Sequence, residues 1–298
     1  MVSIGNKVVL ITGAGRGIGE ATARALAAKG ARLVLTDVDE APLAALVADL
    51  GDIAVGVRAD VRDLAQMQHA VDTGIERFGG IDVVLANAGI SSYGSVLNVD
   101  PETFKRVIDI NTTGVFHTVR AALPSLIERK GYVLVVSSLA AFTACPGLAS
   151  YNASKAGAEH FANALRLEVK YQGVDVGSAH MAWIDTPLVQ DAKSDLSAFQ
   201  DLLAVLPWPL GKTLPVEACV DAFVRAVEKR SRRVYVPGIV GGIGWARSVL
   251  TTRLGEYTTL RHVPRILPKM DAEVKALGRS ESARNRAVVE KDQSTRSA

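Results

Sequence analysis

The sequence predicts an α/β fold in which one doubly wound parallel sheet forms a single domain with a helical C-terminal extension. Short apolar runs rich in β-branched residues alternate with longer helical patterns up to about residue 237. The short runs are nearly continuous in hydrophobicity, as expected for strands that a parallel sheet buries on both faces. Strands and helices that alternate in this way, joined by right-handed crossovers, give a Rossmann-type sheet.

The predicted elements follow one another along the chain. The strand candidates are Val8–Ile11, Arg32–Thr36, Ile53–Val57, Asp82–Ala86, Tyr132–Ser137, Val174–His180 and Val234–Val236. Helical patterns lie between them at about 17–29, 39–49, 63–78, 101–128, 150–171 and 215–230. Asp100-Pro101-Glu102 is typical of a helix start, because it offers an N-cap, a proline at the first position and an acidic first turn. These elements define a domain over residues 1–240, and residues 241–298 form the extension.

The composition is that of a globular chain in a reducing compartment. Of its 298 residues, 48% are hydrophobic, which is enough for one large core. Cys145 and Cys219 are too few for a disulfide framework or a CxxC metal site, so we expect small buried residues. No metal is predicted, because no metal-ligand spacing occurs among His69, His117, His160, His180 and His262. No run reaches the roughly 18 apolar residues of a membrane span and no leader precedes the first strand, so we expect a cytoplasmic protein.

The positive charge of the chain is concentrated in its C-terminal part. The net charge is +3, but residues 243–298 hold 11 Lys and Arg against 6 Asp and Glu, which leaves −2 on the remainder. The simpler interpretation is a solvated, partly helical tail, because charged runs usually keep a segment soluble. The alternative is an arm that touches acidic lipid headgroups at a membrane surface or a partner subunit. No nucleic-acid partner is expected.

The segment after the sixth strand interrupts the alternation of strands and helices. Residues 182–214 hold a short helical pattern at Ser194–Val205, and the surrounding chain is rich in breakers, namely Pro187, Pro207, Pro209 and Gly211. A loop of this length and composition suits a mobile flap over a site.

The extension is expected to become less regular along its length. It begins with Gly241-Gly242-Ile243-Gly244 and continues as a helical pattern to about Leu260. Pro264 and Pro268 are expected to break that pattern, and the polar stretch Arg279–Ala298 is expected to be poorly ordered.

A glycine-rich loop follows the first strand. It reads Thr12-Gly13-Ala14-Gly15-Arg16-Gly17-Ile18-Gly19, and a helical pattern begins at once. Glycines let the backbone turn sharply and approach a pyrophosphate, whose charge is stabilised by the free N–H groups of a helix N-terminus. This order of strand, loop and helix predicts a dinucleotide site formed by Gly13, Gly15, Arg16, Gly17, Ile18 and Gly19.

Acidic residues after the second and third strands favour NAD as the dinucleotide. Asp37 ends the second strand, where a carboxylate can accept both ribose hydroxyls of an adenosine and would repel the 2′-phosphate of NADP. Arg16 keeps NADP as an alternative, since a guanidinium could pair with that phosphate. Asp60 and Val61 are placed to hydrogen-bond and pack on the adenine. Asp60 could also act as the N-cap of the helix that follows.

Four further motifs complete a resemblance to a known family. Asn87-Ala88-Gly89 follows the fourth strand, Asn111 lies in the next helix, Ser138 follows the fifth strand, and Tyr151-Asn152-Ala153-Ser154-Lys155 begins thirteen residues later. With the glycine loop, and in this order, they resemble the short-chain dehydrogenase/reductase family over roughly residues 5–190. The resemblance implies a nicotinamide-dependent oxidoreductase that acts on CH–OH groups, with Asn87, Ala88 and Gly89 in its cofactor site.

The sequence departs from the family pattern after the sixth strand. The family usually has a Pro-Gly pair there, followed by a threonine that meets the nicotinamide amide. This chain has Ala182-Trp183 and then Ile184-Asp185-Thr186. Ile184 and Thr186 are still carried over as cofactor contacts. The bulkier Trp183 either reshapes the wall beside the nicotinamide or simply packs under the flap.

Tyr151 and Lys155 share one face of a helix, because they are four residues apart. A phenol with a pKa of about 10 is a poor base at neutral pH. The neighbouring ammonium and a positively charged nicotinamide both favour phenolate, and so lower the pKa toward the working range. Tyr151 is therefore the predicted proton donor and acceptor. The resemblance implies that Lys155 also binds the nicotinamide ribose.

Two further residues are assigned to catalysis. Ser138 would hydrogen-bond the substrate oxygen as charge develops on it. The thirteen-residue spacing selects Ser138 over Ser137, which faces the other way in a regular strand. The resemblance implies that Asn111 holds a water next to Lys155 and completes a proton path to solvent. Hydride transfer itself belongs to the cofactor.

The substrate is expected to be an apolar alcohol or ketone. The pocket should be built from Ser91–Val96, Leu139–Leu148, Trp183–Thr186 and residues 188–210, with Phe142, Leu148, Trp183, Leu202, Leu206 and Trp208 as its apolar members. Such a lining favours a steroid-, retinoid- or fatty-chain-like molecule over a phosphorylated one. The alternatives are an NADP-dependent reductase of the same fold and a catalytically silent nucleotide-binding sensor. The intact Ser138, Tyr151 and Lys155 argue against the sensor.

The two longest helical patterns predict self-association. They carry apolar positions beyond one core-facing stripe: Val107, Ile110, Val115, Val119 and Leu123 on the first, and Phe161, Leu165 and Val169 on the second. A helix that packs only on its own sheet needs one apolar face, so the wider surface indicates a partner. The resemblance implies pairing of these helices across a two-fold axis, in a homodimer or a homotetramer.

Overall fold

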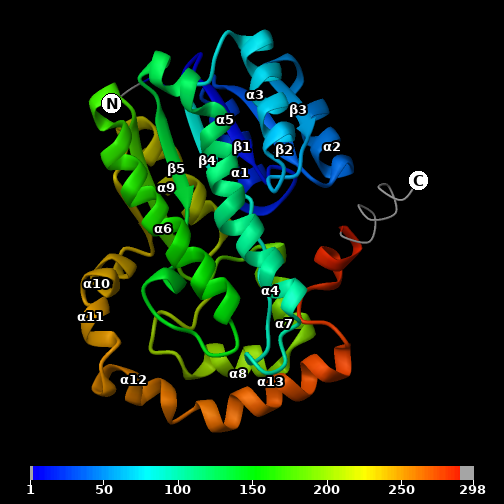
Figure 1. Ribbon diagram of the computed structural model, residues 1–298, viewed down its shortest axis with the longest axis vertical. Helices are drawn as coiled ribbons and strands as arrows, with labels where there is room; N and C mark the ends of the chain where they lie inside the picture. The colour runs from blue at the N-terminus through cyan, green and yellow to red at the C-terminus, as the bar shows by residue number, and fades with distance from the viewer. Residues whose placement is uncertain (1–2, 289–298) are drawn as a thin grey trace.

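Seven parallel strands form one sheet at the centre of the molecule (Figure 1). The structure, a computed structural model, describes residues 3–288. The strands are β1 (Val8–Thr12), β2 (Arg32–Asp37), β3 (Ala54–Arg58), β4 (Val83–Ala86), β5 (Tyr132–Val136), β6 (Asp175–Met181) and β7 (Arg233–Val236). Their order is β3-β2-β1-β4-β5-β6-β7, so the chain winds outward in both directions from β1 and β4. The predicted doubly wound sheet is confirmed.

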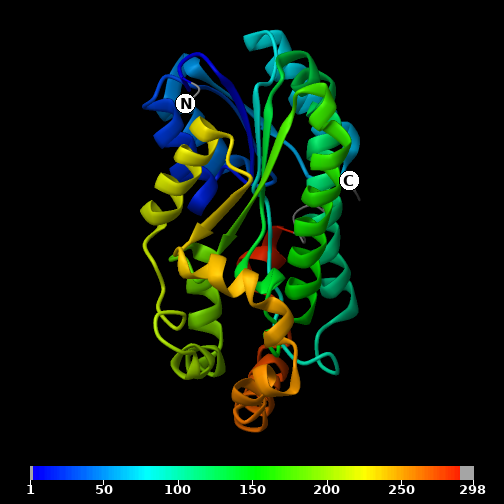
Figure 2. The same cartoon turned by 90° about the vertical axis from the view of Figure 1, so that its left-hand side faces the viewer.

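Helices cover both faces of the sheet (Figure 2). One face is covered by α1 (Gly17–Ala27), α2 (Glu40–Leu50) and α9 (Val216–Lys229), and the other by α3 (Leu64–Phe78), α5 (Gly114–Arg129) and α6 (Ala149–Val169). Val9 and Ile11 of β1 face the first layer, whereas Val8 and Leu10 face the second. Every residue of β1 is buried, which explains its unbroken apolar run.

Strand ends differ from the sequence pattern by one or two residues. β3 begins at Ala54, because Ile53 belongs to a short turn and is 38% exposed. β5 ends at Val136, so Ser137 and Ser138 both lie beyond the regular strand. Because regular strand geometry does not hold these two serines, their side chains can point in different directions.

The predicted helix over 101–128 is interrupted at Asn111. Helix α4 (Pro101–Ile108) and α5 are joined by a five-residue π-helical turn, Asp109–Thr113. Asp100 caps α4 by accepting a hydrogen bond from the backbone N–H of Thr103 at 2.8 Å, as its sequence predicts. π-helical turns inside longer helices frequently mark functional sites.

The expected break at Pro264 and Pro268 is wrong. The extension forms α10 (Ile239–Trp245), α11 (Arg247–Leu250), α12 (Arg253–Leu260) and then α13 (Val263–Leu277), which contains both prolines. Pro264 stands in the first turn, where no N–H is required, and Pro268 removes a single hydrogen bond one turn later. The buried stripe Ile266, Met270 and Val274 packs in one cluster with residues of α8 and outweighs that loss.

The expectation of poor order over Arg279–Ala298 is wrong for residues 279–288, while residues 289–298 lie outside the described part of the chain. Ser280, Glu281 and Ser282 are buried. Three contacts tie this segment to other elements: Glu281 forms an ion pair with Arg106 of α4, Arg279 forms one with Asp195, and the hydroxyl of Ser280 accepts from the backbone N–H of Asp100. Local composition could not reveal partners that lie so far away in the sequence.

The segment predicted as a flap folds into two helices. They are α7 (Pro187–Asp195) and α8 (Ser197–Val205), separated at Leu196 rather than starting at Ser194. α8 packs against α13 through buried Phe199 and Leu202. Among residues 3–288, no helix is both long and apolar enough to cross a membrane.

Candidate active site

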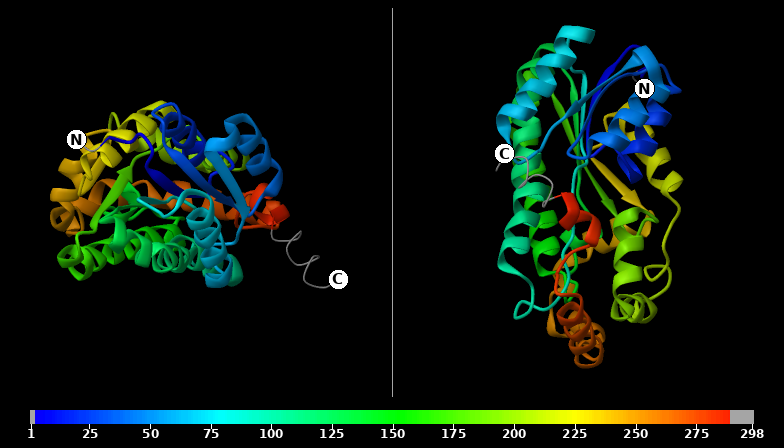
Figure 3. Two further views of the ribbon diagram at one scale, coloured as in Figure 1. Left: turned by 90° about the horizontal axis from the view of Figure 1, so that it is seen from above. Right: turned by 90° about the vertical axis from the view of Figure 1, so that its right-hand side faces the viewer.

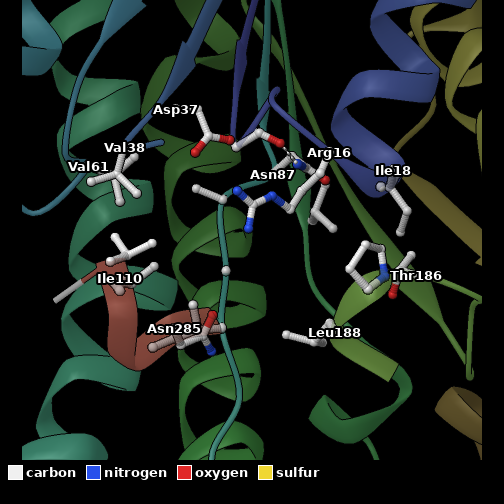
Figure 4. Close-up of a pocket in the computed structure, with 18 of the residues that line it drawn as sticks. Arg16, Ile18, Asp37, Val38, Val61, Asn87, Ile110, Thr186, Leu188 and Asn285 are labelled. Carbon is white, nitrogen blue, oxygen red and sulfur yellow. Dashed lines mark hydrogen bonds between the residues drawn. The ribbon is translucent and has the colours of Figure 1, made fainter. Parts of the chain in front are cut away.

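A cleft of about 260 Å³ lies at the carboxyl edge of the sheet, where the strand order reverses between β1 and β4 (Figure 4). Open α/β sheets bind ligands at this position. Its lining includes most of the residues assigned from sequence, namely Gly13, Arg16, Gly17, Ile18, Asp37, Asp60, Val61, Asn87, Ala88, Gly89, Tyr151, Lys155 and Thr186. The residues that the sequence assigns to one site therefore meet in one cleft.

The glycine loop is compressed against its neighbours. Gly13 adopts a φ of +64°, and a Cβ built there would lie 2.9 Å from the Cα of Ala88. A Cβ on Gly19 would lie 2.1 Å from the carbonyl oxygen of Gly13. Only glycine fits at either position. Because Arg16 caps α1 without a side-chain hydrogen bond, the first N–H groups of the helix are left for an anion in the cleft.

Asn87 holds the loop in place from β4. Its Nδ2 donates to the carbonyl oxygens of Thr12 at 3.0 Å and Gly13 at 3.1 Å. The hydroxyl of Thr12 accepts in return from the backbone N–H groups of Asn87 and Ala88, each at 3.1 Å. Asn87 thus fixes the shape of the glycine loop and also lines the cleft.

The carboxylate of Asp37 is held beside the glycine loop by backbone donors. It accepts hydrogen bonds from the N–H of Gly15 at 2.8 Å and the N–H of Asp39 at 3.0 Å. The guanidinium of Arg16 forms an ion pair with the carboxylate of Asp39. Arg16 is therefore engaged by an acidic residue two positions beyond Asp37.

Asp60 lies on the cleft wall but does not cap a helix. Its carboxylate accepts from the backbone N–H and the guanidinium of Arg62. The N-cap of α3 is Asp63, which accepts from the N–H of Ala65 at 2.9 Å and from that of Gln66. The alternative role of Asp60 as an N-cap is wrong, because α3 begins at Leu64 and Asp63 is its N-cap.

Tyr151 and Lys155 meet on one face of α6. The Nζ of Lys155 lies 5.6 Å from the centroid of the Tyr151 ring and donates to the carbonyl oxygen of Val136 at 3.0 Å. Burial lowers the pKa of Lys155 to about 8. Burial also raises the pKa of Tyr151, and a hydrogen bond with Ser138 opposes that rise. The pKa of Lys155 thus moves toward neutrality, whereas that of Tyr151 moves away from it, because burial disfavours the phenolate. The lowering of the Tyr151 pKa that the sequence predicted is therefore not found.

Ser138, and not Ser137, reaches Tyr151. The Ser138 side chain lies at the phenol, accepts from the N–H of Ala140 at 3.2 Å and donates to the carbonyl oxygen of Met181 at 3.5 Å. The hydroxyl of Ser137 is buried and donates to the carbonyl oxygen of Lys155 at 2.9 Å. The two neighbours diverge, as the sequence spacing predicted, and Ser137 helps to fix the backbone under Lys155.

Asn111 is brought to Lys155 by the π-helical turn. Its amide exchanges two hydrogen bonds of 2.9 Å with the backbone of Ile90 and donates a third to the hydroxyl of Ser154. A Cβ on Gly89 would lie 3.2 Å from both the Oδ1 of Asn111 and the Nζ of Lys155. Because glycine has no side chain, a space remains at Gly89 that borders both the Oδ1 of Asn111 and the Nζ of Lys155.

The comparisons with known proteins agree with this geometry. A sequence model of the short chain dehydrogenase family matches residues 7–197. The chain belongs to the short-chain dehydrogenase family. The predicted family and the predicted class of enzyme, an oxidoreductase, are thereby confirmed.

Relatives of this short-chain dehydrogenase include characterised enzymes. It is 36% identical over 209 residues to (-)-trans-carveol dehydrogenase of Rhodococcus erythropolis, a match covering 64% of this chain and 76% of the relative. It is 34% identical over 194 residues to 3-alpha-(or 20-beta)-hydroxysteroid dehydrogenase of Mycobacterium tuberculosis, covering 64% and 74%. The crystal structure of 3-ketoacyl-(acyl-carrier-protein) reductase from Brucella melitensis, complexed with NADH, superposes with a TM-score of 0.70 at 29% identity, covering 78% of this chain and 98% of that one.

Trp183 packs under the flap of this short-chain dehydrogenase rather than in the cleft. Its ring meets that of Phe199 of α8 edge-on, with centroids 5.2 Å apart. The backbone at Ile184 continues as a bridge to Leu214, and Thr186 is buried at the start of α7. The unusual Ala182-Trp183 pair therefore leaves Thr186 at the cleft, whereas Ile184 is buried in the core beside it.

The expected apolar pocket is only partly correct. Phe142 stacks on His180 with ring centroids 4.3 Å apart, inside the protein. Trp208 is 80% exposed. Leu202 and Leu206 line a separate apolar cavity of about 280 Å³ between α8, α12 and α13. Hydrophobicity alone could not separate core, surface and cavity in this segment.

Several cleft residues were missed from sequence. Arg106 of α4, Asp191 of α7 and, from the far C-terminus, Ser282, Arg284, Asn285 and Val288 all line it. His180 was also missed as a neighbour of the catalytic group: its Nδ1 lies 3.3 Å from the carbonyl oxygen of Ser138. No local motif marks these residues, because tertiary packing alone brings them to the site.

Proposed function

We propose that this short-chain dehydrogenase transfers a hydride between NAD and an apolar secondary alcohol or ketone, with Tyr151 as the general acid and base. The observation that carries the proposal is the arrangement of Tyr151, which lies near Ser138 and beside the buried Nζ of Lys155 on the wall of the cleft. This arrangement supports the roles of proton donor for Tyr151, partner of the substrate oxygen for Ser138 and buried cation for Lys155.

The residues of the cleft fit a dinucleotide. The loop at Gly13 and Gly19 has no room for side chains, and the N-terminus of α1 offers N–H groups to a pyrophosphate. Asp37 would accept the adenosine ribose hydroxyls. NAD is favoured over NADP, because Arg16 is paired with Asp39 instead of being free for a 2′-phosphate. The Brucella relative complexed with NADH supports the same choice.

The mechanism follows from the positions of the side chains. When bound, NAD supplies or accepts the hydride. Tyr151 would donate the proton to the substrate oxygen in reduction and remove it in oxidation. Ser138 would hydrogen-bond the same oxygen and stabilise the charge that develops there. Charged Lys155 would favour the phenolate of Tyr151 and hold the nicotinamide ribose, and Asn111 would hold a water from which the proton is replaced.

The substrate proposal rests on the lining and on the relatives. Apolar Ile90, Val136 and Met181 stand in the same lining as Tyr151. Carveol and hydroxysteroids, the substrates in the names of two relatives, are both apolar cyclic secondary alcohols. An apolar cyclic alcohol or its ketone is therefore the best candidate class.

A screen against secondary alcohols and ketones tests this function. Cyclic terpenoid alcohols, hydroxysteroids, long-chain alcohols and their ketones are each incubated with NAD or NADH, and the NADH absorbance is followed. We expect NAD-linked turnover of cyclic apolar members. Tight NAD binding without turnover of any member would instead support the nucleotide-binding sensor, and NADP-linked turnover alone would overturn the cofactor assignment.

A further inference from the structure

The last described segment of the chain returns from α13 to the cofactor cleft. In Figures 1 and 3 residues 279–288, drawn in red, run back from the end of the molecule that carries α13 toward the region between α4 and α7. Residues 283–288 are helical. In Figure 4 Asn285 lies across the cleft from Ile18 and Thr186. The C-terminus thus adds a wall to a cleft that the motifs of the family build from the first half of the chain.

Buried polar contacts fasten this segment to both helices that flank the cleft. Arg279 donates two hydrogen bonds of 2.7 Å to the carboxylate of Asp195 at the end of α7. Glu281 pairs with Arg106 of α4 at 2.6 Å, with side chains only 4% and 14% exposed. Ser280 accepts from the N–H of Asp100 through its hydroxyl at 2.9 Å. Buried ion pairs hold only when their geometry is well matched, so they fix where the segment runs.

Beyond these anchors, the segment presents polar side chains to the cleft. Arg284 and Asn285 both line it. Arg284 is held by one ion pair of 3.3 Å to Asp191 of α7, and the two side chains are 42% and 23% exposed. A pair as exposed as this contributes little stability. Arg284 can therefore exchange Asp191 for a stronger anionic partner at little cost.

We propose that residues 279–288 form a cofactor-binding strap, in which Arg284 and Asn285 bind the pyrophosphate and ribose groups of the dinucleotide from the side opposite the glycine loop. The inference rests on the proposed function, because it requires a dinucleotide in the cleft. A guanidinium suits phosphate oxygens, and an amide can both donate to and accept from ribose hydroxyls. Since the strap is anchored on α4 and α7, it also restricts the exit of the cofactor.

The test measures binding of NAD itself. Isothermal titration calorimetry gives the Kd of NAD for the wild type, Arg284→Ala and Asn285→Ala, and stopped-flow fluorescence gives the release rate of NADH. Arg286→Ala is the matched control, because Arg286 belongs to the same helical segment but does not line the cleft. We expect Arg284→Ala to raise the Kd by about tenfold, the effect of one lost charge-assisted hydrogen bond. Arg286→Ala should leave it unchanged.

Limited trypsin digestion gives an independent readout. NAD should slow cleavage after Arg284 and Arg286 in the wild type and lose that effect in Asn285→Ala. If the wild type binds NAD and all three variants bind it equally, the strap is wrong and the proposed function stands. If the wild type binds neither NAD nor NADP, the proposed function itself fails. Equal melting temperatures of the variants exclude unfolding as the cause of any difference.

A second inference concerns the surface of α10, α11 and α12, which we call the basic aromatic surface. Its exposed large side chains are Ile239, Trp245, Val249, Tyr257 and Leu260, and Trp245 is 93% exposed. Residues 239–269 carry five basic residues, Arg247, Arg253, Arg261, Arg265 and Lys269, against the single acid Glu256. Arg247 pairs with Glu159 of α6 and Lys269 with Asp201 of α8, which leaves Arg253, Arg261 and Arg265 as the cations on which the inference rests. All five basic residues are exposed. Apolar and aromatic groups among cations on consecutive helices are typical of helices that lie in a membrane interface.

We propose that the basic aromatic surface binds the headgroups of an anionic membrane peripherally. The choice of partner rests on charge complementarity. The surface carries the cations Arg253, Arg261 and Arg265, whereas residues 1–242 carry a net charge of −2 and are not attracted to anionic lipids. Trp245 and Tyr257 have the amphipathic rings that are enriched at membrane–water interfaces. The membrane alternative stated for the tail is thereby assigned to defined residues.

Vesicle sedimentation tests this surface. The full chain is mixed with vesicles of phosphatidylcholine alone or with added phosphatidylglycerol. We expect binding only to the anionic vesicles, lost at high salt and lost in the double variant Trp245→Ser, Tyr257→Ser. Tyr171→Ser is the matched control, since Tyr171 is an aromatic residue that is 85% exposed and lies outside the basic aromatic surface. Failure of the wild type to bind anionic vesicles would refute the proposal, and a self-association abolished by the double variant would assign the surface to a second copy instead.

Discussion

The guanidinium of Arg16 pairs with the carboxylate of Asp39, two residues beyond Asp37. Arg16 was the one sequence feature that favoured NADP, and the pairing neutralises it at the mouth of the cradle. In the proposed cofactor site the two acidic residues have different roles. Asp37 would accept the ribose hydroxyls, and Asp39 would hold the cation with which a 2′-phosphate could otherwise pair.

Replacing Asp39 by Ala should therefore release Arg16 and improve NADP binding. We expect NADP binding to become more favourable by about 1 kcal/mol, the scale of one charge-assisted contact at an exposed site. NAD binding should change little, because the backbone N–H of Asp39 that supports Asp37 is retained. Titration of wild type and variant with both cofactors checks this. An unchanged Kd for NADP would show that Arg16 does not face the 2′-position.

Asp37→Ala should weaken NAD binding by roughly 1–3 kcal/mol, since hydrogen bonds from the ribose to a charged acceptor are lost. The preference for NAD over NADP should narrow in the same variant. Calorimetric titrations of both cofactors measure it, with Asp52→Ala as the control for loss of a negative charge, because Asp52 is exposed and does not line the cleft. An unaltered preference would remove Asp37 from ribose recognition.

Tyr151→Phe should abolish turnover and leave NAD binding nearly intact, because only the transferable proton is lost. The packing of the ring beside Lys155 is retained in phenylalanine. Steady-state kinetics with the best substrate of the screen, together with the Kd of NAD, separate the two effects. Retention of more than a few per cent of the activity would make the assignment of Tyr151 wrong.

Sequence patterns predicted the parts of the site that local chemistry determines. The glycine loop, Asp37 and the Tyr151–Lys155 pair each follow from residues adjacent along the chain or one helical turn apart, so their meeting needs no knowledge of the fold. Ser138 could be distinguished from Ser137 only by its spacing from Tyr151, which the family resemblance supplied.

Long-range packing could not be read in this way. The π-helical turn at Asn111 lies inside an unbroken helical pattern, and nothing in residues 109–113 marks it. Pro268 indicated a break, but burial of Met270 and its neighbours on α13 overrides a local preference. From the sequence, Arg279 and Glu281 belong to a polar tail. In the fold Arg279 pairs with Asp195 and Glu281 with Arg106, and both partners lie far away in the sequence.

Acid should destabilise the protein through His180. Burial, together with the nearby Arg233 and Arg247, lowers the pKa of His180 to about 4, below its ordinary 6.5. Between these two pH values the unfolded chain binds a proton that the native state does not bind. The free energy of unfolding therefore falls as the pH drops through this window, by up to about 3 kcal/mol.

Urea unfolding at pH 7 and near pH 4.5 measures this loss in the wild type and in His180→Gln. The variant should lose less stability between the two conditions. His69→Gln is the control, because His69 is exposed on α3. The same pH dependence in His180→Gln as in the wild type would show that other groups titrate instead.

The exposed apolar surface of α5 and α6 that could mediate self-association is smaller than the sequence indicated. Val107, Val115, Val119, Leu165 and Val169 are all buried within the subunit, so they do not provide a wider apolar face. Other residues of the same helices do: Phe116 of α5 is 42% exposed and meets Phe161 of α6 edge-on, and Leu167 is 81% exposed. We propose a two-fold dimer through α5 and α6, because apolar groups exposed on two adjacent helices are best covered by a second copy of the same pair.

Light scattering on the wild type and on the double variant Phe116→Glu, Leu167→Glu tests the dimer. We expect a dimer or a tetramer for the wild type and a smaller species for the variant, because two buried carboxylates in a two-fold interface would face their own copies. Truncation near Val240 is a poor test, because it removes α13 from its contact with α8. Trp245→Ser, outside both helices, is the control and should assemble like the wild type. If the wild type is active but stays monomeric at micromolar concentration, the prediction is wrong, because α5 and α6 are then stable without a second copy of the chain.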